Sequence, residues 1–407
     1  MTPEPHRRSG RRRFELTTRP LIYGGNHVRL LQNGDEFFPL LMAAINSAER
    51  SIHLETYIFA QDNIGLRVGD ALAAAAGRGV QVRIVVDGFG TGAYAPVLRS
   101  RLAALGAQVI IYRPTRWWRP GRRLLRRMHR KLAVVDDRFA FVGGINIIDD
   151  HHHPDRQPTR LGPRFDFAVL CEGPIVAPIG LTMTRLWRSL ELRQLRRRIG
   201  SPTLAPGALP APFAEGMRVA LLLRDNLRHR RTIEHAYLEA IEGARADVLI
   251  ATAYFFPGRG FRRALTECAR RGVRVRLLVQ GRVEYPIQHY AQEALYSQLL
   301  GAGVEIHEYE ASYLHAKAAV VDETWATVGS SNIDPYSLLL AREANVGVHD
   351  ERFVRRLRGA LEQAIEHESR RVQPAAFAGR GIVRRVINWL AYGIARFGVA
   401  LAGGRDY

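Results

Sequence analysis

The sequence predicts an α/β protein made of two related halves. Apolar, β-branched segments alternate with segments of helical periodicity, which is typical of a sheet covered by helices. The order of these segments in residues 44–112 recurs in residues 240–309, and each copy is followed by a motif of the form HxKxxxxD. A repeat of this length indicates two duplicated domains rather than a short stacked unit.

The first domain is expected over residues 26–199, after a basic tail over residues 1–25 that either contacts phospholipid headgroups or only aids solubility. Runs of β-branched residues predict buried strands, and apolar residues at every third or fourth position predict helices. In chain order the sequence predicts a strand over 51–59, a helix over 65–79, a strand over 80–88, a helix over 97–106 and a strand over 107–112.

The second domain is expected over residues 217–371, where the same order of segments is repeated. Residues 200–216 are rich in Pro, Ala and Gly, so they are predicted to be the linker between the domains. Because strands alternate with helices, each half should hold a mostly parallel or mixed sheet.

The two HxKxxxxD motifs are the strongest functional signal in the chain. The first contains His129, Lys131 and Asp136, and the second contains His315, Lys317 and Asp322. Of the 59 lysines and arginines, lysine occurs only in these two motifs, which leaves 57 arginines. Such restricted use indicates that the compact ammonium group is needed there and that a planar guanidinium will not serve. Side chains two residues apart share one face of a strand, so each motif is predicted to begin a strand with His and Lys on one side.

A hairpin that ends in small residues is predicted after each motif. The bends contain Gly144 and Asn146 in the first half, and Ser330, Ser331 and Asn332 in the second. Glycine and serine allow a backbone to approach a ligand closely, and backbone amides at such bends can face an anion. We expect these residues to support or bind a phosphate group.

With these motifs the chain resembles the phospholipase D superfamily. The resemblance implies two duplicated phospholipase D-like α/β sandwich domains that form one shared active site. It also implies that His129 is the nucleophile, which forms a phosphohistidine, and that His315 is the general acid and then the general base. An attacking imidazole needs its second nitrogen held, and the resemblance assigns this role to Asp166 and Glu343.

The remaining motif residues have simpler expected roles. Lys131 and Lys317, with Asn146 and Asn332, would stabilise the charge on the phosphoryl oxygens. The two motif aspartates stand next to turns at the ends of strands, so we expect them to be structural although they belong to the motif.

The segments RRMHRKLAVVD, FVGGIN, ATAYFFPG and WATVGSSNIDPYSL resemble the bacterial cardiolipin synthases, in particular the shorter B type without N-terminal spanning helices. This resemblance implies phosphatidyl transfer between two phosphatidylglycerol molecules, which gives cardiolipin and glycerol. The alternative is a phospholipase D-type phosphodiesterase or nuclease of the same superfamily, which would use the same catalytic residues. No cofactor and no metal are expected, because His151, His152 and His153 lack the spacing of a metal site.

The net charge of +20 predicts an anionic partner. We expect a phosphatidylglycerol membrane rather than nucleic acid, although Trp117 and Trp118 among arginines would suit either a lipid interface or a single strand. No charge-free apolar run of about 20 residues occurs, so no spanning helix is predicted. The expected location is peripheral, at the cytoplasmic face of a bacterial cell membrane, and the oligomeric state stays open.

The C-terminal segment, residues 372–407, is predicted to be an amphipathic helix at the membrane interface. On a helix its polar residues form one narrow stripe, made of Arg385, Asn388, Tyr392 and Arg396. The alternative is a helix that packs against the protein's own core. The two cysteines, Cys171 and Cys268, stand in different halves and predict no disulfide framework.

Overall fold

The structure is a computed structural model that describes residues 19–114, 126–151, 161–194, 210–225, 229–379 and 381–401. The elements of the first half are β1 (Ile22–Gln32), α1 (Asn33–Asn46), β2 (Ser51–Thr56), α2 (Asn63–Gly77), β3 (Gln81–Asp87), α3 (Tyr94–Ala104), β4 (Gln108–Tyr112), β5 (Lys131–Val135), β6 (Phe139–Gly143), β7 (Phe167–Glu172) and α4 (Val176–Gln194). The expected order of strands and helices is confirmed. The first strand begins at Ile22, so the tail expected to reach residue 25 ends earlier.

The second half repeats this order and adds helices at its end. Its elements are β8 (Met217–Arg224), α5 (Thr232–Gly243), β9 (Asp247–Thr252), α6 (Arg259–Arg270), β10 (Arg274–Gln280), α7 (Pro286–Leu300), β11 (Glu305–Tyr309), β12 (Lys317–Val321), β13 (Trp325–Gly329), the π-helical turn η2 (Tyr336–Leu340), β14 (Glu343–His349), α8 (Glu351–Glu368), β15 (Ser369–Arg371), α9 (Pro374–Ala378) and α10 (Ile382–Leu401). Residues 200–209 of the expected linker lie outside the described residues.

Within the described residues, fifteen strands are joined in the order β15-β11-β10-β9-β12-β13-β14-β8-β1-β7-β6-β5-β2-β3-β4. Pairing is parallel in β2-β3-β4 and in β9-β10-β11, and the motif hairpins β5-β6 and β12-β13 are antiparallel. The sheet is therefore mixed, as expected. Strand β1 joins the halves, because it pairs with β7 on one side and with β8 on the other.

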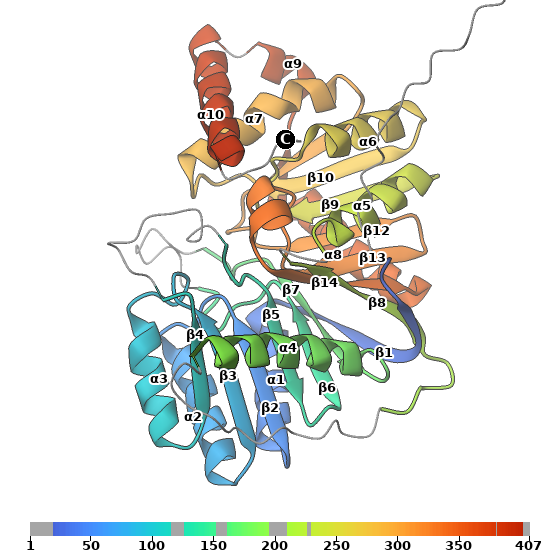
Figure 1. The fold of residues 1–407 in the computed structure, drawn as a ribbon. Coiled ribbons are helices and arrows are strands. Elements are labelled where there is room, and N and C mark those ends of the chain that lie inside the picture. The colour runs from blue at the N-terminus through green and yellow to red at the C-terminus, as the bar shows by residue number, and fades with distance from the viewer. Residues whose placement is uncertain are drawn as a thin grey trace, which may run out of the picture.

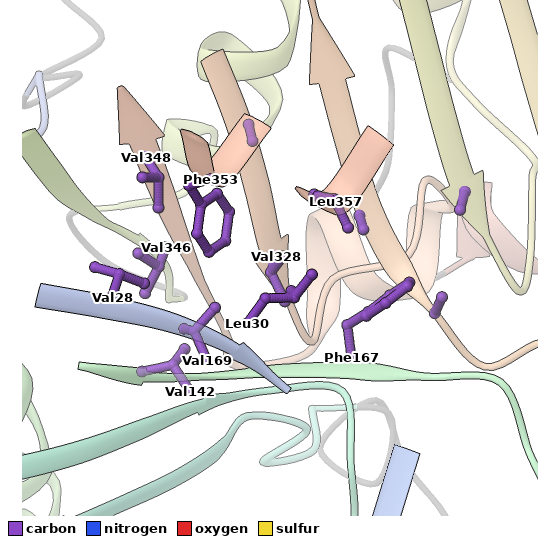
Figure 2. Packing of buried hydrophobic residues seen from close by; sticks show 14 of the residues in the cluster. Val28, Leu30, Val142, Phe167, Val169, Val328, Val346, Val348, Phe353 and Leu357 are labelled. Carbon is purple, nitrogen blue, oxygen red and sulfur yellow. The ribbon is translucent and has the colours of Figure 1, made fainter. Parts of the chain in front are cut away.

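Each half has its own outer layer of helices (Figure 1). The inner faces of the two halves meet in a shared apolar core, to which α4 and α8 also contribute. Helices α1, α2 and α3 contribute to one apolar cluster with the first half's strands, and α5, α6 and α7 to another with the second half's strands. In Figure 2, side chains of β6 and β7, such as Val142 and Val169, face Val328 and Val346 of the second half. Each fully buried side chain of this kind contributes roughly 1.5–3 kcal/mol, so the shared core holds both halves in one fixed arrangement.

The last helix, α10, packs against α7 with its polar stripe. Asn388 is only 5% exposed, and the ring of Tyr392 lies 5.3 Å from that of Phe256. Arg384 binds Glu293 of α7 through two hydrogen bonds of 3.0 Å, whereas Arg385 of the expected stripe is exposed. The apolar face points away from the protein, with side chains 40–78% exposed: Ile382, Val383, Val386, Ile387, Trp389, Leu390, Ile394 and Phe397.

Candidate active site

The two motif histidines lie just before their strands, not inside them. Strands β5 and β12 begin at the lysines, so the expectation that His and Lys share a strand is wrong by two residues. Backbone contacts with the other half hold these segments instead. The N–H of His129 donates to the carbonyl of Arg342 at 2.9 Å, and the N–H of His315 donates to that of Phe165 at 2.8 Å.

Each histidine is held by a carboxylate from the opposite half. The Nδ1 atom of His129 lies 3.0 Å from Glu343 Oε1 and 3.1 Å from Oε2, and the Nδ1 atom of His315 lies 2.6 Å from Asp166 Oδ2. Both carboxylates are almost completely buried. The four side chains named by the sequence thus form two crossed pairs, and neither half contains a complete pair.

Burial sets the protonation of these pairs. It lowers the pKa of His129 against the attraction of Glu343, and it lowers the pKa of His315 further because Lys317 lies nearby. Burial also raises the pKa of Asp166 to about 7, although Lys317 opposes the shift. With a proton on Nδ1, each neutral imidazole keeps a lone pair on Nε2 for chemistry.

The two lysines lie beside the histidines. Lys131 Nζ donates to the carbonyl of His129 at 2.6 Å, and Lys317 Nζ donates to the carbonyl of His315. Burial lowers the pKa of Lys131 to about 7 and that of Lys317 to about 8, although Glu343 and Asp166 oppose the shift. A bound anion favours the charged form of a nearby ammonium, so a phosphate group between the lysines would raise both pKa values.

The small residues after each motif support the two carboxylates. A Cβ atom on Gly144 would stand 2.2 Å from Asp166 Oδ1, so only glycine leaves room for this carboxylate. At the corresponding place in the second half, the hydroxyl of Ser330 donates to Glu343 Oε2 at 2.5 Å. Ser331 is used by the bend, where its N–H donates to Asn345 Oδ1 at 3.2 Å.

The two asparagines are buried at the rims of the bends, each 3% exposed. Asn146 accepts the backbone N–H of Ile58 at 3.1 Å, and Asn332 accepts the hydroxyl of Thr252 at 3.4 Å. Their side-chain oxygens thus connect the first hairpin to the segment after β2 and the second hairpin to β9. Their NH2 groups are the donors that we expect to bind phosphate.

The motif aspartates lie at the other ends of β5 and β12, away from the lysines. Asp136 has a φ of 53° and accepts the backbone N–H groups of Glu49, Arg50 and Ser51. Asp322 has a φ of 48° and accepts those of Arg245, Ala246 and Asp247. Both carboxylates therefore fasten a loop to a strand and do not join the histidines.

Two supporting groups were not found by sequence reasoning. Asp87 and Gln280 are the last residues of β3 and β10, where they accept the N–H of Met128 at 2.9 Å and of Leu314 at 3.1 Å. They hold the segments that carry the histidines. Aligning the two copies of the repeat would have placed them together.

Tyr57 makes the two sides of the site unequal, and no motif in the sequence indicated it. Its ring lies 4.9 Å from the ring of His129, and Lys131 Nζ lies 5.4 Å from its centre. Thr56 and Thr252 make the same hydrogen bond to the residue two positions later, so Ala253 matches Tyr57 in the second half. Only the first motif has an aromatic neighbour at this place.

Some sequence predictions cannot be placed. Trp117, Trp118, His152 and His153 lie outside the described residues, and His151 is exposed. In the part of the chain that the structure describes, no three His, Cys, Asp or Glu side chains are grouped so as to hold a metal ion. None of the helices described is long and apolar enough to cross a membrane. Both cysteines are buried and free.

Comparison with known proteins gives consistent matches along the chain. A family model described as cardiolipin synthase, PLD-like domain, matches residues 41–155 and 237–365. Cardiolipin synthase B of Escherichia coli (strain K12) is 37% identical over 391 residues, which cover 93% of this chain and 90% of that protein. Cardiolipin synthase B of Salmonella typhimurium is 38% identical over 397 residues, with the same coverage.

A solved structure has the same fold. The crystal structure of phosphatidylserine synthase from Haemophilus influenzae Rd KW20 superposes with a TM-score of 0.67, covering 94% of this chain and 96% of that one. At 13% identity this match supports the architecture alone. It agrees with the two related halves described above.

Proposed function

The chain belongs to the cardiolipin synthase family with phospholipase D-like domains, and on this basis we propose that it transfers a phosphatidyl group from one phosphatidylglycerol to another, giving cardiolipin and glycerol. The observation that carries the proposal is the crossed arrangement of His129 with Glu343 and His315 with Asp166. With Nδ1 held in both, one imidazole is the nucleophile in its neutral form, and the other, once it also carries a proton on Nε2, is the acid and then the base.

The reaction then follows in two balanced steps. Nε2 of one histidine, His129 by the family resemblance, attacks phosphorus. The P–O bond to glycerol breaks while the other histidine, which enters the step as an imidazolium favoured by the bound anionic phosphate, gives its Nε2 proton to the leaving oxygen. The hydroxyl of the second phosphatidylglycerol next attacks the phosphohistidine. Its oxygen bonds to phosphorus, the P–N bond breaks, and its proton returns to the second histidine. The protonated lysines and the asparagine NH2 groups stabilise the phosphoryl oxygens.

The substrate side of the site carries exposed apolar residues. Phe89 follows β3 and is 60% exposed, and Val283, Tyr285 and Ile287 follow β10 and are 47–54% exposed. These loops follow Asp87 and Gln280, which hold the histidine segments. Apolar side chains around such an opening suit a site that draws lipid from a bilayer.

The apolar face of α10 supports a second part of the proposal, that the protein binds peripherally to the cytoplasmic face of a bacterial membrane. Helix α10 is fixed to α7 through Arg384 and Glu293, and α7 begins directly after the loop that carries Tyr285. Its exposed Trp389, Leu390 and Phe397 would enter the interface, and the net charge of +20 draws the protein to anionic lipid.

One experiment tests the function. Purified protein is incubated with phosphatidylglycerol vesicles in the presence of a chelator, and lipids and glycerol are quantified by mass spectrometry. We expect equal amounts of cardiolipin and glycerol, and no product from His129→Ala or His315→Ala. Phosphatidic acid as the main product would instead favour the hydrolase, and restoration by one specific metal would contradict the metal-free chemistry.

A further inference from the structure

Five arginines lie close to one another near His129, at the ends of several strands. Strands β4 and β8 end in this region, and β5 and β14 begin there. The arginines follow β4, precede the first motif, end β8 or precede β14: Arg113, Arg126, Arg127, Arg224 and Arg342. Arg342 stands next to Glu343 in the chain, and its carbonyl accepts the N–H of His129.

Three of these guanidinium groups donate to backbone carbonyls. Arg113 donates to the carbonyl of Arg126 at 2.8 Å, Arg127 to that of Arg113 at 3.0 Å, and Arg224 to that of Ala341. A carbonyl orients a guanidinium without cancelling its charge. Nearby carboxylates are already engaged, since Asp87 lies 3.6 Å from Arg127, which is buried with it, and Glu343 holds His129.

Two of these arginines keep buried donors without a partner. Arg224 is 3% exposed, and its Nε atom has no hydrogen-bond partner among the described residues. The Nε atom of Arg342 is in the same condition. Burial, with repulsion by Arg342 and Arg126, lowers the pKa of Arg224 to about 10 against the attraction of Glu343 and Asp225. A buried donor left unpaired is costly, so a ligand anion would relieve this site.

The proposed reaction requires a second anion position. The reacting phosphate lies between the histidines and lysines, and the acceptor phosphatidylglycerol brings another phosphate, separated from its terminal hydroxyl by a glycerol arm. We propose that Arg126, Arg224 and Arg342 form a second anion site that binds the phosphate of the acceptor. This inference rests on the proposed function and adds the means by which a lipid acceptor is preferred to water.

The second anion site does not change the second step of the proposed reaction. The hydroxyl oxygen forms the new bond to phosphorus, the bond from phosphorus to histidine breaks, and the hydroxyl proton passes to the other histidine. The arginines only hold the acceptor in place, which raises the effective concentration of its hydroxyl over water.

Two soluble acceptors can isolate the role of the second phosphate. Glycerophosphoglycerol carries the terminal hydroxyl and a phosphate, whereas 1,3-propanediol carries a hydroxyl without charge. Both are supplied together to the full-length protein with long-chain phosphatidylglycerol vesicles as donor, and the ratio of the two phosphatidyl products is measured. The intact protein should favour the charged acceptor.

The test variants are Arg342→Gln and Arg126→Gln. Arg126 is exposed, so its substitution is safe for folding. Loss of one charged hydrogen bond should lower the product ratio about tenfold or more, while the rate with propanediol stays near that of the intact protein. Arg342→Lys should recover part of the ratio. Arg263→Gln is the matched control, because Arg263 is an exposed arginine on α6.

Distinct results separate the possible failures. An unchanged product ratio in Arg342→Gln and Arg126→Gln would overturn the second anion site. An equal fall with both acceptors would also overturn it, because the arginines would then serve the reacting phosphate. If the intact protein transfers phosphatidyl groups to neither alcohol, the proposed function itself fails.

Discussion

The carboxylate of Glu343, at the start of β14, accepts a hydrogen bond from His129, which precedes β5 in the other half of the molecule. Asp166 and His315 repeat this relationship in the opposite direction. Because each motif imidazole contacts a carboxylate from the other domain, the two pairs form only when both halves pack together. The shared core between β6, β7, β13 and β14 provides that packing.

Removing the charge of either carboxylate should therefore impair catalysis more than binding. Glu343→Gln and Asp166→Asn keep the size of the side chain but no longer favour a proton on Nδ1. We expect kcat to fall by about two to four orders of magnitude with KM nearly unchanged. Ser330→Ala removes the hydrogen bond to Glu343 and the one that the hydroxyl accepts from the N–H of Ala344, but leaves the carboxylate in place, so it should cost much less. Steady-state kinetics on phosphatidylglycerol micelles decide the matter, and a fall of less than tenfold in both carboxylate variants would refute the assigned role.

The two lysines should not tolerate arginine. Lys131 and Lys317 are 5% and 1% exposed, and each ammonium already donates to the carbonyl of its own motif histidine. A longer, planar guanidinium would have to displace buried neighbours. Lys131→Arg and Lys317→Arg should each lower kcat/KM by two orders of magnitude or more, with circular dichroism unchanged. Folded variants with full activity would show that the restriction of lysine to these positions is accidental.

The lysines also predict how pH acts on binding and on stability. Burial lowers the pKa of Lys131 to about 7 and of Lys317 to about 8, so the charged forms are present below pH 7 and lost as the pH rises through 8. Affinity for the anionic substrate should fall over this range. Stability should change in the opposite direction, because above pH 7 the unfolded chain binds more protons than the folded one until its lysines titrate near 10.5.

Comparison with a variant isolates these lysines from other titrating groups. In Lys131→Met, the rise in Tm between pH 7 and 9.5 should be smaller than in the intact protein. An identical pH dependence of Tm in both proteins would mean that Lys131 keeps an ordinary pKa.

Membrane binding should depend on the exposed face of α10. Truncation after residue 380 would not separate membrane binding from stability, because it removes Arg384 and leaves Glu293, which is 2% exposed, without that partner. Substitutions on the exposed face avoid this problem. Trp389→Asp with Leu390→Asp should weaken sedimentation with phosphatidylglycerol vesicles at least tenfold while Tm changes little. Leu181→Asp, at an exposed leucine on α4, is the control. Equal sedimentation of all three proteins would place the anchor elsewhere.

The duplicated α/β architecture and the motif residues that the structure brings together could be predicted from the sequence, because both depend on local periodicity and on repeated motifs. It could not show the crossed pairing, since His129 and Glu343 are 214 residues apart and His315 and Asp166 are 149 apart. Such pairs depend on how the two sheets pack. Tyr57 was missed because its match in the second half is an alanine, so the repeat itself hides it.

The C-terminal helix shows the same limit. Periodicity predicted its polar stripe, but the face that packs is decided by a partner, the buried Glu293 on α7. With that carboxylate binding Arg384, the stripe turns inward and the apolar face is exposed. No local pattern within residues 382–401 contains this information.

Covalent trapping tests the central claim, that two histidines from two halves act as one catalytic unit. The protein is mixed with phosphatidylglycerol labelled with ³²P, quenched in alkali within milliseconds to seconds, and digested for peptide mapping. We predict a labelled phosphatidyl group on one motif histidine, in a bond that is stable to alkali and labile to acid. When unlabelled phosphatidylglycerol is then added in excess, the label should leave the histidine and appear in cardiolipin. Cardiolipin formation without any labelled histidine, or a label that persists when both His129 and His315 are replaced by alanine, would contradict the account.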